Sequence, residues 1–290
     1  MEPIYLPVYL FTHARELQAW LEKQRQANRT VGFVPTMGAL HAGHMHLIEA
    51  AQQHYQVVVC SIFVNPTQFN DPSDLAKYPR TPEKDIDMLL QAGAHAVYLP
   101  AVNDIYPPGG PRESFAFGRL EELLEGAHRP GHFAGVGMVV ARLLRLVSPN
   151  GMFLGEKDYQ QCLVIEALVQ QMGWTNQVQL HRCATQREPS GLAMSSRNAR
   201  LSDQGLATAA HIYAVIQSCQ ERYQHFTPDT LSSWASMTLN ALPHTHTEYV
   251  SFANADTLEP LEQWNDSPHA RVLVAVQVEG VRLIDNAALF

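Results

Sequence analysis

Two histidines, His41 and His44, lie three residues apart where a buried strand gives way to a helix. The segment reads VGFVPTMGALHAGHMHLI over residues 31–48. Its apolar run predicts a strand that ends at Pro35, and a glycine-containing turn leads to a helix that we expect to open near His44. Free backbone N–H groups and the helix dipole favour an anion there, and the glycines let the backbone approach it closely. The segment therefore predicts a phosphate-binding turn, although it matches neither of the ordinary glycine-rich nucleotide motifs.

Two plainer interpretations of the same histidines stay open at this point. His41, His44 and His46 could form a metal-binding tract, but no carboxylate or cysteine lies between or next to them in the sequence to complete such a site. The histidines could also be incidental to a purely structural turn. We expect His46 to lie on a different helical face from His44, at the surface or in packing.

Polar side chains also follow two other predicted strands at the point where each strand ends. Asn65 and Gln68 follow the run 57–64, and Gly155-Glu156-Lys157-Asp158 follows the run 152–155. Open α/β sheets bind ligands at the carboxyl ends of their strands. Neutral amides suit a hydroxylated substrate, a lysine can neutralise a phosphate, and Asp158 suits a ribose hydroxyl or a metal ion. On its own, the segment 155–158 would equally suit a solvated turn.

The run Met194-Ser195-Ser196-Arg197 could supply a further set of phosphate ligands. Its two hydroxyls and its guanidinium are good donors to phosphate oxygens. Short runs of this kind are common by chance, so its position matters more than its composition. It follows the point where we expect the chain to change domain, which is where a mobile closing loop would act.

The elements that must position these residues alternate between strand and helix. We expect strands over 31–35, 57–64, 96–100, 152–155 and 178–183, with helices over 15–26, 44–53 and 161–172 and another from Thr81-Pro82-Glu83 to just before Gly93. Continuous apolar strands suit a parallel sheet that is buried on both faces. The pattern predicts an α/β fold, a Rossmann-like doubly wound parallel sheet, over residues 1–185. Helices over 206–224 and 230–242 and strands over 247–253, 272–278 and 281–286 predict a smaller α+β domain over residues 186–290.

Composition excludes several classes of protein. Lys and Arg number 20 against 28 Asp and Glu, and the resulting charge of −8 argues against a general nucleic-acid or anionic-membrane partner. Four cysteines lie far apart and form no CxxC pair, which argues against a zinc knuckle or a disulfide framework. The N-terminal segment has no basic residue before Arg15, so it does not resemble a signal peptide. We therefore expect a soluble cytoplasmic protein.

The segment PTMGALHAGH, residues 35–44, resembles the signature of the pantoate–β-alanine ligase (pantothenate synthetase) family. This family is part of a nucleotidyltransferase superfamily named for its His-x-Gly-His motif. The resemblance continues through SIFVNPTQF and DPSDLAKYPRT (61–81), the long stretch 125–161, ATQREPSGLAMSSRNARLS (184–202) and the final VRLIDN (281–286). It therefore covers nearly the whole chain, although Ala134, Gly137 and Ala184 depart from the commoner family pattern.

The resemblance implies an ATP-dependent ligase that joins pantoate to β-alanine through a pantoyl adenylate and releases AMP and pyrophosphate. It implies catalytic roles for His41, His44, Lys157 and Arg197. It implies ATP contacts from Met37, Gly38, Ala39, Leu40, His41, Ala42, Gly43, His44, Gly155, Glu156, Lys157, Asp158, Gln186, Met194, Ser195, Ser196 and Arg197. Gln68, Gln161 and Asn65 would bind pantoate or β-alanine, and Asp85 would lie near a Mg²⁺ ion that accompanies ATP. The family is expected to be homodimeric and to use no tightly bound organic cofactor.

Two rival functions remain at this point. A related adenylyltransferase that acts on another small acceptor would keep the histidine turn and the serine loop, but it should lack the two glutamines, Gln68 and Gln161. A non-catalytic nucleotide-binding protein would not need both signatures intact.

Overall fold

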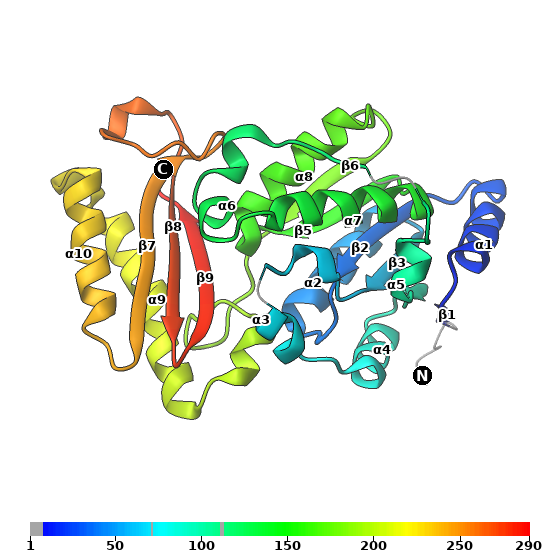
Figure 1. Cartoon of the computed structure of the whole chain (residues 1–290), viewed down its shortest axis with the longest axis horizontal. Coiled ribbons are helices and arrows are strands. Elements are labelled where there is room, and N and C mark those ends of the chain that lie inside the picture. The colour runs from blue at the N-terminus through cyan, green and yellow to red at the C-terminus, as the bar shows by residue number, and fades with distance from the viewer. Residues whose placement is uncertain (1–7, 71, 111–112) are drawn as a thin grey trace.

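The first part of the chain forms a six-stranded parallel sheet, in the computed structural model that describes residues 8–70, 72–110 and 113–290 (Figure 1). Its strands are β1 (Tyr9–Phe11), β2 (Val31–Thr36), β3 (Val57–Ile62), β4 (Ala96–Tyr98), β5 (Gly151–Gly155) and β6 (Gln179–Cys183). The spatial order is β1-β4-β3-β2-β5-β6, and every pairing is parallel. The predicted α/β class and five of these strands are confirmed. The edge strand β1 was not predicted, because three residues are too few to show a periodicity.

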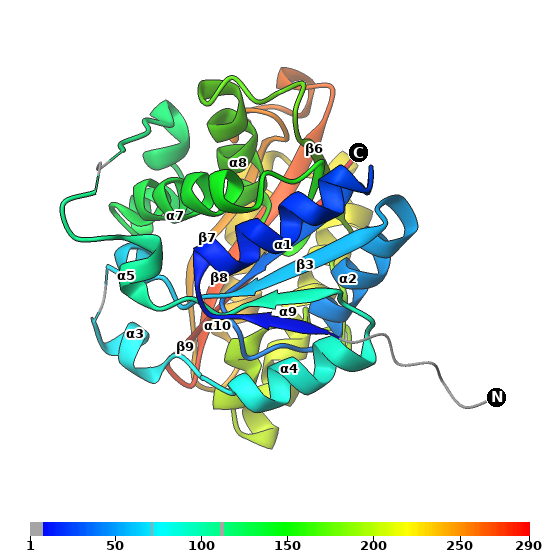
Figure 2. The same ribbon diagram turned by 90° about the vertical axis from the view of Figure 1, so that its right-hand side faces the viewer.

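Helices cover both faces of this sheet (Figure 2). One hydrophobic core joins the sheet to α1 (Ala14–Gln26), α7 (His132–Val147) and α8 (Tyr159–Gln171). A second core, on the opposite face, joins it to α2 (Ala42–His54) and α4 (Pro82–Gln91). The strand side chains alternate between the two cores, so that Phe33 belongs to the first and Val34 to the second. This alternation is why the strands read as continuous apolar runs.

The remaining helices of the parallel-sheet part are short. They are α3 (Pro72–Lys77), α5 (Val102–Ile105) and α6 (Glu125–His128), together with the 3-10 turns Pro66–Gln68, Gly118–Glu121 and Glu156–Asp158. None of these short helices was predicted, because four to six residues do not complete an amphipathic pattern. In the part of the chain that the structure describes, no helix has the length and apolar character needed to cross a membrane.

The order of the strands determines where the site can form. From β2 the chain proceeds outward through β3 and β4, whereas β5 and β6 extend the sheet on the other side of β2. The order therefore reverses between β2 and β5, and ligands of open α/β sheets bind at such a point. The histidine turn follows β2 and the turn with Lys157 follows β5, so two neighbouring strands bring together motifs more than a hundred residues apart.

The last part of the chain forms an antiparallel sheet backed by two helices. Its strands are β7 (Thr245–Asn254), β8 (Ala270–Val278) and β9 (Val281–Ala288), and its helices are α9 (Asp203–Arg222) and α10 (Pro228–Asn240). The 3-10 turns Ser196–Arg200, Tyr223–His225 and Trp264–Asp266 complete it. The predicted α+β character is confirmed. This part has a hydrophobic core of its own, drawn from residues between 192 and 289, and we propose the domain boundary at residues 185–186 on that ground.

A glycine brings α7 against the turn that carries Gln68. The backbone of Gly135 lies so close to that turn that an added Cβ would be 2.4 Å from the carbonyl oxygen of Thr67 and 2.7 Å from the Cα of Gln68. Both neighbours are backbone atoms, which cannot move aside by a rotamer change. The position of Gln68 therefore depends on the absence of a side chain at residue 135.

We expect Gly135→Ala to destabilise the protein even though alanine is the better helix former. In a helix, alanine stabilises the folded protein by about 0.5–1 kcal/mol relative to glycine. Forcing a methyl group into a filled backbone contact costs about 1–3 kcal/mol. Chemical denaturation measures the net loss. Gly155→Ala is the matched control, because a Cβ there meets nothing within 4 Å, and a similar loss in both variants would contradict the packing argument.

Candidate active site

Two adjoining cavities lie along the carboxyl edge of the parallel sheet. The sheet-edge cavity, of about 240 Å³, lies over β2 and β5, and the interface cavity, of about 460 Å³, lies between the two parts of the chain. Arg129, Lys157, Asp158, Ser195 and Arg197 line both. Most of the predicted site residues line the sheet-edge cavity, namely Met37, His41, Gly43, His44, Asn65, Gln68, Gly155, Lys157, Asp158, Gln161, Gln186, Met194, Ser195, Ser196 and Arg197. The others, Gly38, Ala39, Leu40, Ala42, Glu156 and Asp85, do not line it.

The two histidines cap the helix that follows β2. His41 is the N-cap of α2, so the helix begins two residues earlier than predicted. The Nδ1 atom of His41 accepts the N–H of Gly43 at 3.2 Å, and the Nδ1 atom of His44 accepts the N–H of His41 at 3.3 Å. In each neutral ring the proton is therefore on Nε2. Because both rings line the cavity, Nε2–H is the group that each offers to a ligand.

Both rings are neutral at pH 7. Burial, followed by the charge of Lys157, lowers the pKa of His41 to about 4. Burial and the neighbouring His41 lower the pKa of His44 to about 3. The ring centroids are only 4.1 Å apart, and at that distance two imidazolium ions would repel each other strongly. The pair therefore acts through hydrogen-bond donation.

A buried carboxylate holds the turn between β2 and these histidines. Asp85, on α4, accepts the backbone N–H of Ala39 at 2.9 Å and that of Leu40 at 2.8 Å. Its Oδ1 atom also accepts the hydroxyl of Thr81 at 3.0 Å. Gly38 and Ala39 have positive φ angles of 83° and 49°, a conformation that a carboxylate bound to successive N–H groups stabilises.

This contact corrects one expectation and weighs against another. The backbone N–H groups expected to be free for phosphate are already bonded, those of residues 39 and 40 by Asp85 and those of residues 41 and 43 by the histidine rings. Side chains, rather than the backbone of this turn, must therefore supply most of the hydrogen-bond donors to a bound phosphate. The carboxylate of Asp85 is 1% exposed and already accepts three hydrogen bonds, so the geometry does not favour its predicted role near Mg²⁺.

The predicted amides, Asn65 and Gln68, belong to one hydrogen-bonded turn. Asn65 is fully buried and donates to the Oε1 atom of Gln68 at 3.2 Å and to the carbonyl oxygen of Gly135 at 3.1 Å. Its own oxygen accepts from Thr67 and from Tyr106. Every polar atom of the Asn65 side chain is therefore used inside the protein. The geometry favours a structural role for Asn65, which presents Gln68 to the cavity.

The Nε2 atom of Gln68 donates only to the sulfur of Met37, at 2.8 Å, among the described contacts. A thioether is a weak acceptor, so a ligand oxygen could displace it at little cost. Gln161 lies on the first turn of α8 and lines the same cavity. The two amides therefore face a common space, as the sequence analysis expected.

Sequence reasoning missed the wall of this cavity and one histidine. Val136, Val139, Val140 and Leu143 of α7 line the cavity, and their spacing of three and four residues was the available signal. The Nε2 atom of His132 lies 3.1 Å from Arg129, which can only donate, so Nδ1–H donates to the carbonyl oxygen of Gln68 at 2.8 Å. His132 thus holds the backbone of Gln68, whose side chain accepts from Asn65.

The serine loop lies against the histidine turn. The hydroxyl of Ser196 donates to the carbonyl oxygen of Ala39 at 2.8 Å, and the Ser195 hydroxyl accepts the N–H of Arg197 at 3.3 Å. The guanidinium of Arg197 pairs with Asp74 of α3 at 2.8 Å, and Arg200 contacts the other oxygen of Asp74 at 3.3 Å. Arg197, which is predicted to bind phosphate, is therefore already paired with the carboxylate of Asp74. Whether the loop moves stays a prediction.

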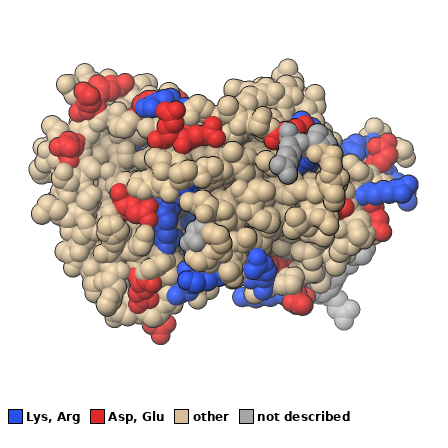
Figure 3. All heavy atoms as spheres, viewed as in Figure 1, with Lys and Arg blue, Asp and Glu red and all other residues tan. Residues whose placement is uncertain are grey.

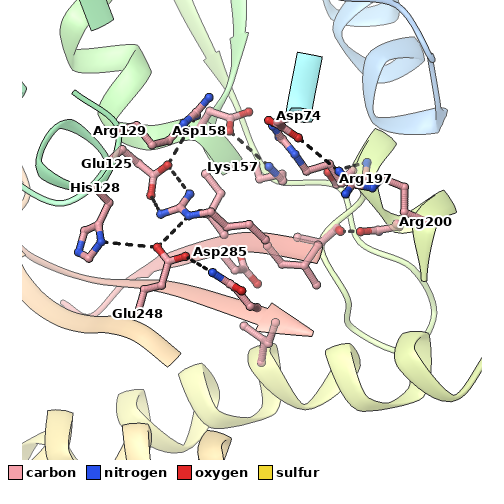
Figure 4. A pocket seen from close by; sticks show the side chains of 18 of the residues that line it. Asp74, Glu125, His128, Arg129, Lys157, Asp158, Arg197, Arg200, Glu248 and Asp285 are labelled. Atoms are coloured by element: carbon pink, nitrogen blue, oxygen red, sulfur yellow. Dashed lines mark hydrogen bonds and ion pairs between the residues drawn. The ribbon is translucent and has the colours of Figure 1, made fainter. Parts of the chain in front are cut away.

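An ion-paired cluster lines the interface cavity (Figure 4). Glu125 of α6 accepts two hydrogen bonds from Arg282 of β9, at 2.6 and 2.7 Å, and one from the hydroxyl of Tyr249 at 2.7 Å. Burial opposes the charged form of Glu125, but the contacts with Arg282 outweigh it and lower the pKa of this carboxyl to about 2. Arg282 also donates to Glu248 at 2.8 Å. Figure 3 shows acidic and basic side chains next to one another in the middle of this face, where the two parts of the chain meet.

A protein-only metal cage is not found among the described residues, because no group of three or more His, Cys, Asp or Glu side chains is placed to hold an ion. Mg²⁺ that accompanies a nucleotide needs only one or two carboxylates besides the phosphates. Asp158 fits that need, because its side chain is about half exposed and lines both cavities. Asp71, a further carboxylate of the segment DPSDLAKYPRT, lies outside the described residues.

The chain matches known proteins over nearly all of its length. The family model described as pantoate-beta-alanine ligase covers residues 9–288. A pantothenate synthetase from Porphyromonas gingivalis is 42% identical over 277 residues, which are 96% of this chain and 98% of that protein. A pantothenate synthetase from Cytophaga hutchinsonii is 41% identical over 280 residues, again 96% of this chain and 98% of that protein.

Solved structures agree with these matches. The crystal structure of pantothenate synthetase from Thermus thermophilus has a TM-score of 0.90 at 38% identity and covers 97% of this chain and 99% of that one. The structure of pantoate-beta-alanine ligase from Francisella tularensis, complexed with beta-gamma ATP and beta-alanine, has a TM-score of 0.82 at 33% identity and covers 98% of each chain.

The neutral histidines predict a pH dependence of stability. His41 and His44 have pKa values of about 4 and about 3 when folded, against 6.5 when unfolded. As the pH falls from 6.5 toward 4, the unfolded chain therefore binds protons that the folded chain does not. The free energy of unfolding must fall over that window, by about 1–2 kcal/mol per histidine at pH 5. In urea unfolding, the free energy of unfolding of His44→Gln should fall less between pH 7 and pH 5 than that of the wild-type protein. An equal fall in the variant and the wild type would contradict the lowered pKa of His44.

Proposed function

The chain belongs to the pantoate–β-alanine ligase family, and we propose that the sheet-edge cavity is where it joins pantoate to β-alanine to make pantothenate. In the first half-reaction a carboxylate oxygen of pantoate attacks the α-phosphorus of ATP. The bond to the bridging oxygen breaks, pyrophosphate leaves, and pantoyl adenylate forms. In the second, the amine of β-alanine attacks the acyl carbon, the amide bond forms, a proton is lost from nitrogen, and AMP leaves.

The paired neutral histidines are the observation that carries this mechanism. Adenylyl transfer depends on positioning and on stabilising charge, and it needs no nucleophile from the protein. His41 and His44 fix their Nδ1 atoms on the backbone and line the cavity with Nε2–H free of those contacts. We propose that these two donors bind the phosphate oxygens whose charge grows in the transition state. Neutral rings can do so at pH 7 without changing their protonation.

Pantoate carries hydroxyl groups, a carboxylate and two methyl groups on one carbon, and the cavity offers partners for each kind. Gln68 and Gln161 would bind the oxygens. The valines of α7, among them Val136 and Val139, would contact the methyl groups, because they form the apolar side of the same cavity. The weak contact between Gln68 and Met37 makes exchange for a ligand oxygen favourable.

The triphosphate would lie against Lys157, Ser195, Ser196 and Arg197, which line the cavity together. For Arg197 to bind phosphate it must leave Asp74, or share its guanidinium with it. A polyphosphate carries more charge than one carboxylate, so the exchange is favourable once ATP is bound.

Mg²⁺ would be held by Asp158 together with the phosphates. When bound, the ion would neutralise phosphate charge and aid the departure of pyrophosphate. Asp158 is preferred to Asp85, because the oxygens of Asp85 already accept backbone and hydroxyl protons.

The remaining partners follow from the family and from the charge of the chain. We propose that the protein works as a homodimer in the cytoplasm and that its ligands are the small molecules ATP, pantoate and β-alanine. The net charge of −8 supports no role for nucleic acid or anionic membrane. A sizing experiment in solution tests the dimer.

Isotope exchange between ATP and pyrophosphate tests the reaction itself. We expect exchange only when pantoate is present, because the first half-reaction needs its carboxylate, and pantothenate only after β-alanine is added. His44→Ala should slow exchange by roughly 10²–10³-fold, the scale for the loss of one preorganised donor. Isotope exchange that does not depend on pantoate but requires another acceptor would support a related adenylyltransferase. ATP binding without exchange would indicate a non-catalytic protein.

Arg197→Ala should slow adenylate formation much more than the attack of β-alanine on preformed pantoyl adenylate. The reason is that pyrophosphate has left before the second step. Single-turnover measurements separate the two steps. Arg200→Ala is the matched control, because it also pairs with Asp74 but does not line the sheet-edge cavity. Equal slowing of both steps by Arg197→Ala would mean that the loop only closes the site.

A further inference from the structure

Strand β9 contacts three of the segments that build the site, although the proposed function uses none of its residues. Arg282 holds Glu125 in the stretch before α7. Asp285 pairs with Arg187, at the base of the serine loop, at 2.6 and 3.0 Å. Asn286 contacts the turn that carries Lys157. The segment VRLIDN, which the sequence analysis noted only as a resemblance, is therefore a structural part of the site.

The contact of Asn286 with the lysine turn is the most direct of the three. Its Nδ2 atom donates to the carbonyl oxygen of Glu156 and to that of Lys157, each at 2.9 Å. The side chain is 4% exposed. Both amide hydrogens are thus used on two successive carbonyls, which fixes the peptide unit between them. The start of the Lys157 side chain is fixed with that unit.

The orientation of this amide is determined by its other partner. The Oδ1 atom of Asn286 accepts from a guanidinium nitrogen of Arg271 on β8. Arginine has no acceptor, so the oxygen must face it, and the NH₂ group must face the two carbonyls. Arg271 is itself held over the ring of Tyr159, with its guanidinium carbon 3.7 Å from the ring centroid. Arg271 and Asn286 therefore form a hydrogen-bonded link of fixed orientation between the antiparallel sheet and the lysine turn.

We propose that Asn286 is a positioning residue for the first half-reaction, acting through Lys157. This inference rests on the proposed function, in which Lys157 binds the phosphates of ATP. Among the described hydrogen bonds, the Nζ atom of Lys157 contacts only Asp158 of the same turn, so a displacement of the backbone of the turn moves Nζ with it. Displacement of about 1 Å in a positioned group can cost 10²-fold in rate. Asn286 touches no reacting atom, and its effect should disappear when Lys157 is absent.

Asn286→Asp and Asn286→Ala test this inference together. Aspartate keeps the shape and the acceptor for Arg271, but it places an oxygen where the amide hydrogens were, against two carbonyl oxygens. We expect both variants to slow single-turnover formation of pantoyl adenylate by roughly 10–10²-fold. The attack of β-alanine on preformed adenylate and the binding of pantoate should change by less than about threefold. If Asn286→Ala does not fold, the isosteric Asn286→Asp variant still gives the measurement.

A double-mutant cycle distinguishes positioning from general damage. In a Lys157→Ala background, either change at Asn286 should slow adenylate formation by less than about threefold, because residues that act through one another are not additive. Arg119→Ala is the matched control, since it removes an exposed contact between the two parts, to Glu259, without touching the turn. It should leave the rate unchanged.

The same slowing in the wild-type and Lys157→Ala backgrounds, or an equal loss in Arg119→Ala, would overturn the inference. If the wild-type protein forms adenylate and the cycle is additive, only the role of Asn286 fails. If the wild-type protein forms no pantoyl adenylate, the proposed function is wrong, and the role of Asn286 is then wrong as well.

Discussion

The parallel pairing of β2 with β5 is the constraint on which the rest of the structure depends. Gly32 and Phe33 of β2 lie opposite Gly151 and Met152 of β5, and the strand order reverses between these two strands. Their carboxyl ends therefore meet at one edge, so the histidine turn and the lysine turn become neighbours. Helices cover both faces of the sheet, and the sheet-edge cavity and the interface cavity both lie along this edge.

In the proposed ATP site of this acidic chain, the cations are held on carboxylates. Arg197 lies on Asp74, Lys157 beside Asp158, and Arg282 on Glu125. Each pairing limits the cost of keeping a partly buried charge before the ligand arrives. The first two carboxylates are partly exposed, so their cations can be shared with phosphate. Glu125 is buried and held by several donors, so its cation stays with the protein. Net charge thus says little about the local field at the site.

The sequence predicted five strands of the parallel sheet, most of its long helices and most of the polar residues that line the sheet-edge cavity. The elements follow from apolar periodicity, and the site residues follow from motifs that end strands and from the resemblance to the family. It did not predict what occupies the backbone of the histidine turn. That answer depends on Asp85, 46 residues from Ala39, and a lone aspartate on a helix carries no sign of its partner. The structural role of Asn65 was missed for a similar reason, because its acceptor on Gly135 is 70 residues away. Periodicity reports which face is buried, whereas individual hydrogen bonds depend on topology.

The contacts of β9 also bear on when the protein becomes active during its own synthesis. Domains generally fold as units from the N-terminal end while the chain is being made. The parallel sheet is complete once β6 has emerged, yet Asn286 is 130 residues beyond Glu156, and Arg282 is 157 beyond Glu125. Contacts of such long range form late and slowly. A chain still on the ribosome can therefore hold a folded parallel sheet without the contacts that fix its lysine turn. If Asn286 positions Lys157 as proposed, turnover of ATP waits until the antiparallel sheet has docked.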